Sequence, residues 1–243
     1  MEVRKENDKR ELNTYSSYCL PEIYIFVSGG SIIRNLNLQN KRTIMVDLWD
    51  QRYAVENYVY GKEPNEWFVE KLKIFKPGKL LLPAEGEGRN AVWAASNGWD
   101  VTAFDHSMEA RAKALKLAED RGVKFEYLVK DLRCFRAEEN SFDSIGLIYV
   151  HMPSSFRQNV HEELINLLKP GGSLVFEAFT KSQLNHKSGG PSDLDMLYDP
   201  EEIRKDFSAL KILEFHSIKL HLHEGELHKG IADVVRIFAR KIS

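Results

Sequence analysis

The sequence predicts an α/β fold in which a mostly parallel sheet carries helices on both faces and ends in an antiparallel hairpin. Strand-like and helix-like segments alternate from Lys79 onward, which is the pattern of β–α–β units. The first strand-like run, residues 79–84 (KLLLPA), is continuously apolar, as expected for a strand buried on both faces. Two β-prone runs near the C-terminus are separated by a glycine-containing turn, which predicts the hairpin.

The expected elements begin and end at residues with clear local preferences. Ser107 is a natural N-cap for an Ala/Leu/Lys-rich helix, Asn65 caps an earlier helix, and Gly98 and Gly122 each stop a helix. The Pro-Gly-Gly of residues 170–172 ends the last one. We therefore expect strands at residues 79–84, 100–105, 124–129, 142–150, 173–179, 212–222 and 231–240, and helices at residues 66–75, 89–97, 107–121 and 153–168.

Composition is that of an ordinary globular chain. The 243 residues are 43% apolar and 29% charged, with a net charge of -2, so no basic excess indicates nucleic-acid binding. No apolar run approaches the ~20 residues that cross a bilayer, and two cysteines are too few for a disulfide framework. We expect a cytoplasmic monomer or homodimer with neither nucleic acid nor membrane as a partner.

The chain divides into an N-terminal extension and one working domain. Residues 1–12 are almost all charged or amide, so residues 1–44 are expected to be a poorly ordered extension. The β-prone run at residues 23–27 is too short for the apolar core of a signal peptide. Residues 45–243 contain no repeat or linker and are expected to form a single domain, for which Met45 could be the natural start.

A glycine-containing loop between the first strand and its helix predicts a nucleotide-type ligand. The loop runs from Ala84 to Ala91 (AEGEGRNA). Glycines such as Gly86 and Gly88 let the backbone approach a ligand, and the helix N-terminus offers free N–H groups. Asp105 ends the second strand, where a carboxylate can accept both ribose hydroxyls of an adenosine. Dehydrogenases and S-adenosylmethionine enzymes share this pattern.

The acidic residues of the loop favour S-adenosylmethionine over a dinucleotide. A pyrophosphate would face Glu85 and Glu87, at a cost on the order of a kcal/mol or more for each. The ammonium and sulfonium groups of S-adenosylmethionine would be attracted instead, and Arg89 could pair with its carboxylate. The alternative is that both glutamates point into solvent at the start of the helix, where they favour the helix dipole.

Short motifs in a fixed order cover nearly the whole chain beyond the extension. They are residues 49–53 (WDQRY), 60–65 (YGKEPN), 85–90 (EGEGRN), 101–107 (VTAFDHS) and 168–172 (LKPGG), Gln183 with residues 189–191 (GGP), and residues 224–225 (EG) with His228 and Gly230. This series resembles class I S-adenosylmethionine-dependent methyltransferases, nearest to the tellurite-resistance branch and more distantly the thiopurine methyltransferases. Leu82 and Ala84 depart from the family pattern, which usually has an acidic residue and a glycine there.

The resemblance implies a Rossmann-like fold with a seven-stranded sheet and S-adenosyl-L-methionine as cofactor. It further implies that the methionine end lies over Ala84 to Gly88, the ribose on Asp105, and the adenine beside His106, Asp131 and Leu132. Trp49 lies in a segment that resembles the aromatic cover of such sites. Two alternatives stay open: Asp131 could instead be an N-cap, and Trp49 could simply pack in the core.

Two histidines are candidate catalytic residues. Val150 and His151 end the fourth strand, beside the expected methyl group, and His151 could accept a proton because an imidazole has a pKa of ~6.5. The alternative is that His151 lines the adenine pocket or caps the next helix. His228 is the second candidate, and the family pattern also favours His228 and Glu224 as pocket or turn-organising residues.

Two other groups carry weaker arguments. His221 and His223 share one face of the expected strand, but zinc would need further ligands, so no metal is expected. Arg157 could bind an anionic acceptor, although such an arginine is more often a solvated helix residue.

We expect a methyltransferase that acts on a small-molecule acceptor. The leading choice is a soft nucleophile, meaning a thiol or a selenium or tellurium oxyanion. An O- or N-methyltransferase acting on another metabolite or a macromolecule stays open, as does a cofactor-binding protein without catalysis.

Overall fold

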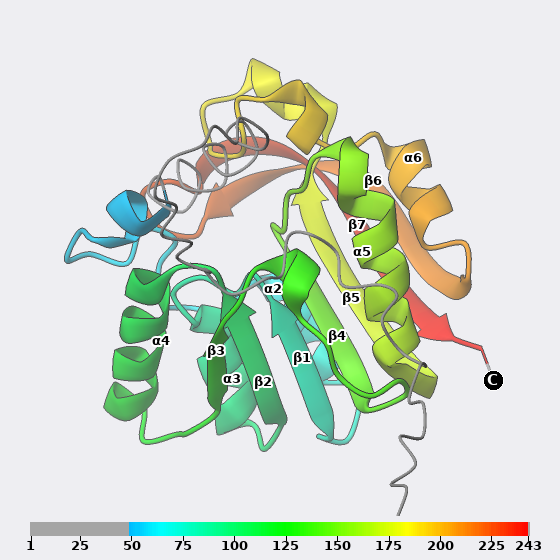
Figure 1. Ribbon diagram of the computed structural model, residues 1–243. Helices are drawn as coiled ribbons and strands as arrows, with labels where there is room; N and C mark the ends of the chain where they lie inside the picture. The colour runs from blue at the N-terminus through cyan, green and yellow to red at the C-terminus, as the bar shows by residue number, and fades with distance from the viewer. Residues whose placement is uncertain (1–48, 243) are drawn as a thin grey trace, which may run out of the picture.

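A seven-stranded mixed sheet lies between two layers of helices (Figure 1). The computed structural model describes residues 49–242, and the extension expected at residues 1–44 lies outside them. The strand order is β3-β2-β1-β4-β5-β7-β6, in which β7 is antiparallel to both neighbours and the other pairs are parallel. The expected mostly parallel sheet with a C-terminal hairpin is therefore confirmed.

The elements alternate along the chain as the sequence predicts. The strands are β1 (Lys79–Pro83), β2 (Asp100–Asp105), β3 (Glu126–Val129), β4 (Phe142–Ile148), β5 (Leu168–Phe179), β6 (Leu210–His223) and β7 (Lys229–Lys241). The helices are α2 (Glu66–Leu72), α3 (Arg89–Ser96), α4 (Met108–Asp120), α5 (Ser154–Leu167) and α6 (Pro200–Asp206), with 3-10 turns η1 (Leu132–Cys134), η2 (Lys181–Asn185) and η3 (Leu194–Met196). Residues 49–53 form a further helical turn.

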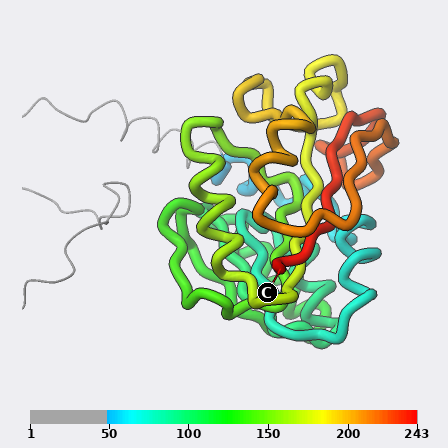
Figure 2. Tube along the Cα trace, turned by 90° about the vertical axis from the view of Figure 1, so that its right-hand side faces the viewer, coloured from blue at the N-terminus to red at the C-terminus, as the bar shows by residue number. Residues whose placement is uncertain are grey.

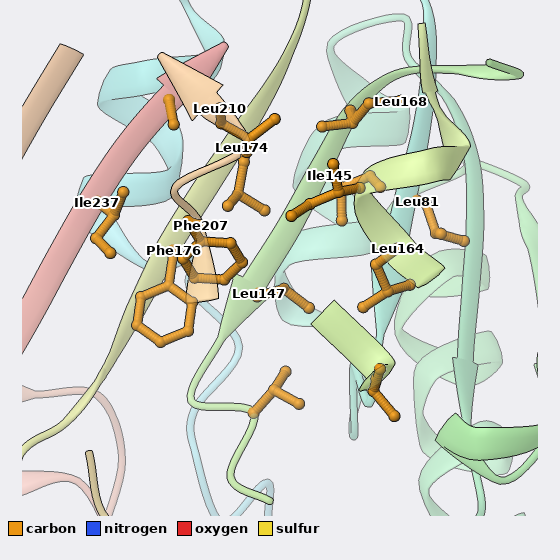
Figure 3. Close-up of a cluster of buried hydrophobic side chains, with 14 of the residues drawn as sticks. Leu81, Ile145, Leu147, Leu164, Leu168, Leu174, Phe176, Phe207, Leu210 and Ile237 are labelled. Atoms are coloured by element: carbon orange, nitrogen blue, oxygen red, sulfur yellow. The ribbon is translucent and has the colours of Figure 1, made fainter. Parts of the chain in front are cut away.

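Side chains alternate between two cores along the central strands. In β1, Leu81 packs in the core under α5 and α6, whereas Leu80 and Leu82 pack in the core under α2, α3 and α4. Figure 2 shows α5 and α2 on opposite sides of the sheet. Figure 3 shows the first core, to which α5 contributes Leu164 and the segment after α6 contributes Phe207.

Several observed elements have other bounds than expected. β4 ends at Ile148, so Val150 and His151 follow the strand instead of ending it. β5 begins at Leu168, which pairs with Phe142, so the residues expected only to end a helix already belong to the sheet. β3 begins two residues later than expected, at Glu126. α6 was not expected, although its Asp199 N-cap followed by Pro200 is a recognisable helix start.

The topology places the functional edge of the molecule at the carboxyl ends of the parallel strands. From β1 the chain first adds β2 and β3 on one side and then β4 and β5 on the other, so the strand order reverses between β1 and β4. Open α/β sheets bind ligands at such a switch point. Figure 1 shows residues 49–60 in blue, with η2 and η3 in yellow to orange, beyond this edge. Among residues 49–242, no helix combines the length and apolar character needed to cross a bilayer.

Gly88 sets the packing of α3 against α4 and generates a prediction about stability. Its φ is +85°, and a Cβ at this position would lie 2.5 Å from the Cβ of Ala114. Gly88→Ala therefore adds a steric clash to the strain of a left-handed backbone. We expect it to lower the free energy of unfolding by about 2–4 kcal/mol, measured by urea denaturation.

The matched control is Gly122→Ala. Gly122 has φ +66° and no atom within 4 Å of the added Cβ, so only the backbone strain of about 1 kcal/mol applies. If both variants lost the same free energy of unfolding, the contact between Gly88 and α4 would not be tight.

Candidate functional site

The glycine loop is held in a left-handed conformation at the end of β1. Ala84, Gly86 and Gly88 have φ values of 49°, 63° and 85°. Ala84 adopts this conformation although it carries a Cβ, which costs about 1–2 kcal/mol. The N–H of Gly86 donates to Oδ2 of Asp105 at 3.2 Å, so the loop is tied to the end of β2.

Asp105 and His106 form the polar end of β2. Asp105 is only 5% exposed, and its Oδ1 accepts from the N–H of Ser107 at 3.0 Å and lies 3.4 Å from Nδ1 of His106. Burial raises the pKa of Asp105, while His106 and the backbone donors partly oppose the rise. Nε2 of His106 is buried without a hydrogen-bond partner in the described part of the chain. These groups fit the ribose and base of an adenosine ligand.

Glu85 turns back onto the start of α3 instead of facing solvent. Its Oε1 accepts from the N–H groups of Asn90 and Ala91 at 2.9 and 2.8 Å. Burial raises the pKa of Glu85 to about 7, despite these hydrogen bonds and the nearby Arg89. The carboxylate therefore satisfies helix N–H groups that would otherwise be unpaired.

Glu87 fastens the segment that precedes α2. Its two carboxylate oxygens accept from the N–H groups of Val59 and Tyr60, each at 3.2 Å, and Lys113 of α4 pairs with Oε1 at 2.7 Å. Neither Glu85 nor Glu87 points into solvent, so the alternative placement considered for them is wrong. Both carboxylates hold backbone around the loop.

Arg89 pairs with the hairpin turn between β6 and β7. Its guanidinium lies 3.0 Å from Oε2 of Glu224, and both side chains are largely buried. Although burial acts in the opposite direction, Arg89 and His228 hold the pKa of Glu224 down at about 2. The expected pairing of Arg89 with a cofactor carboxylate would have to compete with this ion pair.

A second buried ion pair lies beside the first. Glu177 of β5 is fully buried, pairs with Arg236 of β7, and accepts from Nδ2 of Asn65 at 2.6 Å. The same Asn65 amide donates to Glu224 at 2.9 Å. Asn65 also caps α2, as the sequence predicts, by accepting from the N–H of Phe68. One asparagine thus links α2 to both carboxylates.

His228 lies among aromatic rings with one nitrogen on a carboxylate. Its Nδ1 is 3.3 Å from Oε2 of Glu224, and its ring centroid is 4.5 Å from those of Tyr60 and Tyr149. Burial lowers the pKa of His228, although Glu224 acts in the other direction. A neutral imidazole oriented by a carboxylate can accept a proton at its second nitrogen.

His151 has hydrogen bonds on both ring nitrogens. Nδ1 is 2.8 Å from the carbonyl of Met196, and the N–H of Phe179 donates to Nε2 at 3.5 Å. The ring stacks between Phe179 and Tyr198. Burial lowers the pKa of His151 to about 4. These contacts fit a residue that fixes the segment after β4 better than one that exchanges protons.

Asp131 and Leu132, which were expected around adenine, follow β3, and Val150, which was expected beside the methyl group, follows β4. Asp131 caps η1 by accepting from the N–H of Arg133, and its carboxylate also pairs with that side chain at 2.7 Å. Leu132 lines a cavity of about 170 Å³ beside α5. Val150 is buried and its carbonyl accepts from the Tyr198 hydroxyl at 2.7 Å. The N-cap alternative for Asp131 is therefore present in the structure.

The weaker candidates lie elsewhere or are already paired. Nε of Arg157 is 2.7 Å from Asp206, between α5 and α6. His221 and His223 stack at 4.4 Å on the exposed hairpin. Within residues 49–242, no three His, Cys, Asp or Glu side chains are grouped to hold a metal.

Sequence reasoning missed several residues of this site. Glu177 carried a signal, because it is an acidic residue inside the apolar run LVFEAF. Tyr149 directly follows β4 and has φ 55°, an unusual conformation that no local pattern predicts. Tyr53 lies in the WDQRY motif and stacks on Trp49 at 5.5 Å between ring centroids. Trp49 itself is half-buried, over Tyr53 and not in either core.

Comparison with known sequences identifies the central part of the chain. Residues 83–172 match the methyltransferase domain family. The chain is 23% identical over 161 residues to the probable S-adenosyl-L-methionine-dependent methyltransferase TehB of Haemophilus influenzae, covering 66% of this chain and 54% of that protein. It is 27% identical over 143 residues to phosphoethanolamine N-methyltransferase 2 of Caenorhabditis elegans, covering 56% and 32%. It thus spans about half or less of the length of these relatives.

Solved structures share the fold at low sequence identity. One comes from work on the conversion of a disulfide bond into a thioacetal group during echinomycin biosynthesis, with a TM-score of 0.67, 17% identity, and coverage of 82% of this chain and 93% of that one. TehB from Haemophilus influenzae has a TM-score of 0.61, 19% identity, and coverage of 81% and 66%.

The fold and the family match agree with the resemblance seen in the motifs. The strand order, the antiparallel β7 and the glycine loop after β1 occur together in one chain. Residues 83–172 therefore match a methyltransferase domain, and the chain has the Rossmann-like fold of class I S-adenosylmethionine-dependent methyltransferases, which TehB shares.

Proposed function

We propose that this protein transfers the methyl group of S-adenosylmethionine to a small-molecule acceptor in the cytoplasm, and that the acceptor atom is a soft nucleophile. The observation that carries the proposal is that a candidate cofactor site and a candidate proton acceptor lie next to each other at one edge of the sheet. The glycine loop and Asp105 lie at the ends of β1 and β2, and the Glu224–His228 pair is joined to the same loop through Arg89.

The surroundings of His228 support a thiol or a selenium or tellurium oxyanion as acceptor. Tyr60, Tyr149 and Phe179 surround the imidazole, at centroid distances of 4.5, 4.5 and 5.3 Å. Soft, polarizable atoms make favourable contacts with aromatic rings. A structural neighbour comes from work on the conversion of a disulfide bond, which is also sulfur chemistry.

A nitrogen acceptor is the second candidate. Two similar curated proteins are a phosphoethanolamine N-methyltransferase and a glycine/sarcosine N-methyltransferase. The buried carboxylates Glu177 and Glu224 would attract an amine, but each already pairs with an arginine of this chain. The charge arrangement therefore favours the soft nucleophile over the amine.

The chain's own residues would orient the acceptor and remove its proton. When bound, the cofactor would supply an electrophilic methyl group on its sulfonium. Transfer of that methyl group would depend mainly on in-line positioning of the acceptor atom and on exclusion of water. Glu224 fixes the His228 tautomer by accepting from Nδ1–H, so Nε2 can take the proton of a thiol. In this mechanism His151 serves as a positioning residue for the segment after β4.

The first prediction concerns cofactor binding. Calorimetric titration should show micromolar binding of S-adenosylmethionine and none of NADH. Asp105→Ala should abolish binding, because it removes both the ribose acceptor and the anchor of the Gly86 N–H. Binding of NADH alone would contradict the proposed cofactor, and unchanged binding by the variant would remove Asp105 from the site.

The second prediction concerns the proton acceptor. With thiols, selenite and tellurite offered as acceptors and S-adenosylhomocysteine as the measured product, His228→Gln should lower kcat for a thiol about 100-fold or more. Cofactor affinity should stay unchanged.

Because burial lowers the pKa of His228, the wild-type rate should hold through neutral pH and fall only below the ordinary histidine range. The comparison variant is His151→Gln, which should slow thiol methylation far less at equal protein stability. A larger fall of kcat in His151→Gln than in His228→Gln would make His151 the proton acceptor and His228 the positioning residue.

A further inference from the structure

A short segment before α2 connects the glycine loop to the turn between β6 and β7. This segment, residues 57–61, is called the strap. On the side of the turn, the N–H of Leu227 donates to the carbonyl of Val59 at 3.2 Å. A Cβ added to Gly225 would lie 2.5 Å from the backbone nitrogen of Gly61, so the turn and the strap meet backbone to backbone.

Glu87 of the glycine loop holds the other side of the strap. It is 3% exposed. Its Oε1 accepts from the N–H of Val59 and its Oε2 from the N–H of Tyr60, each at 3.2 Å. Lys113 of α4 lies 2.7 Å from Oε1 and also donates to the carbonyl of Asn57 at 2.6 Å. Both carboxylate oxygens are therefore engaged with the strap and α4.

Tyr60 connects the strap to the proposed proton acceptor. Its ring centroid lies 4.5 Å from that of His228. Its backbone N–H is one of the two that Glu87 binds, and its hydroxyl accepts from Arg52 at 3.0 Å. A displacement of the strap would therefore move one aromatic wall of the acceptor site relative to the imidazole.

Resting on the proposed function, we propose that Glu87 is a positioning residue for the methyl acceptor. Its carboxylate fixes Tyr60 against His228 and so connects a wall of the acceptor site to the glycine loop. Glu87 acts through Tyr60 and contacts neither reactant. Binding of the acceptor then requires the strap in place, whereas binding of the cofactor requires the backbone of the loop and Asp105.

Glu87→Gln separates these two requirements because it keeps the size and shape of the side chain. A carboxylate accepts at two oxygens, whereas an amide has one oxygen and an NH2 group that only donates. If the oxygen stays on Val59 and Lys113, the NH2 group faces the N–H of Tyr60. Two donors then meet, and the amide of Tyr60 loses its acceptor.

The test compares binding of the acceptor with binding of the cofactor product. With thiols as acceptors and formation of S-adenosylhomocysteine as the measured rate, Glu87→Gln should raise the KM for the thiol about tenfold, because a hydrogen bond to a charged group is lost. At saturating thiol, kcat should fall less. The Kd for S-adenosylhomocysteine, measured by calorimetry, should stay within about a factor of three of the wild-type value.

The matched control is Glu63→Gln. Glu63 is exposed and its carboxylate pairs with Arg121 at 3.0 Å. This variant should change neither constant, and equal melting temperatures would exclude a folding defect in either protein. An unchanged KM for the thiol in Glu87→Gln, or an equal weakening of thiol and S-adenosylhomocysteine binding, would overturn the inference.

Amide hydrogen exchange, followed by NMR, tests the same connection without an acceptor. In Glu87→Gln, exchange should become faster at Tyr60 and at Leu227, whose acceptor lies on the strap, and stay unchanged at Phe68 in α2. Unchanged exchange at either Tyr60 or Leu227 would overturn the inference. Failure of the wild-type protein to methylate any thiol would instead overturn the proposed function.

Discussion

The ion pair between Arg89 and Glu224 joins the two halves of the site. Arg89 is the first residue of α3, directly after the glycine loop, and Glu224 lies in the turn between β6 and β7. Their side chains meet at 3.0 Å with 7% and 15% exposure. Because His228 also binds Glu224, the position of the proposed proton acceptor depends on the same carboxylate that is anchored to the cofactor loop.

Such a pair is stable only if its remaining polar atoms are satisfied, because burying charge is costly. Here the amide of Asn65 donates hydrogen bonds to both Glu224 and Glu177. Arg236 neutralises the charge of Glu177. Two acids and two bases thus form a neutral buried unit. Loss of any one member would leave an uncompensated charge beneath the acceptor site, so the unit fixes the hairpin turn relative to α2 and the loop.

The sequence predicts the sheet, its hairpin and most helices because strand runs, caps and glycine stops are local signals. The partners of charged residues are not local. The sequence predicts that Glu85 and Glu87 face either the ligand or solvent. Both instead accept hydrogen bonds from backbone N–H groups, because the path of the loop decides where a side chain points. Likewise Arg89 meets a residue 135 positions away in the chain, which spacing alone cannot reveal. Glu177 is an exception, because an acidic residue inside an apolar run is a local signal.

Backbone strain at this edge of the sheet has a structural use. Ala84 and Tyr149 follow β1 and β4, the strands that flank the switch point, and both have positive φ although neither is glycine. At Tyr149 the conformation is held by its N–H, which donates to the carbonyl of Glu177 at 2.7 Å. It places the ring between His228 and Phe179, at centroid distances of 4.5 and 4.7 Å. A relaxed extended residue would send this side chain elsewhere, so the strain at the end of β4 builds the wall of the proposed acceptor site.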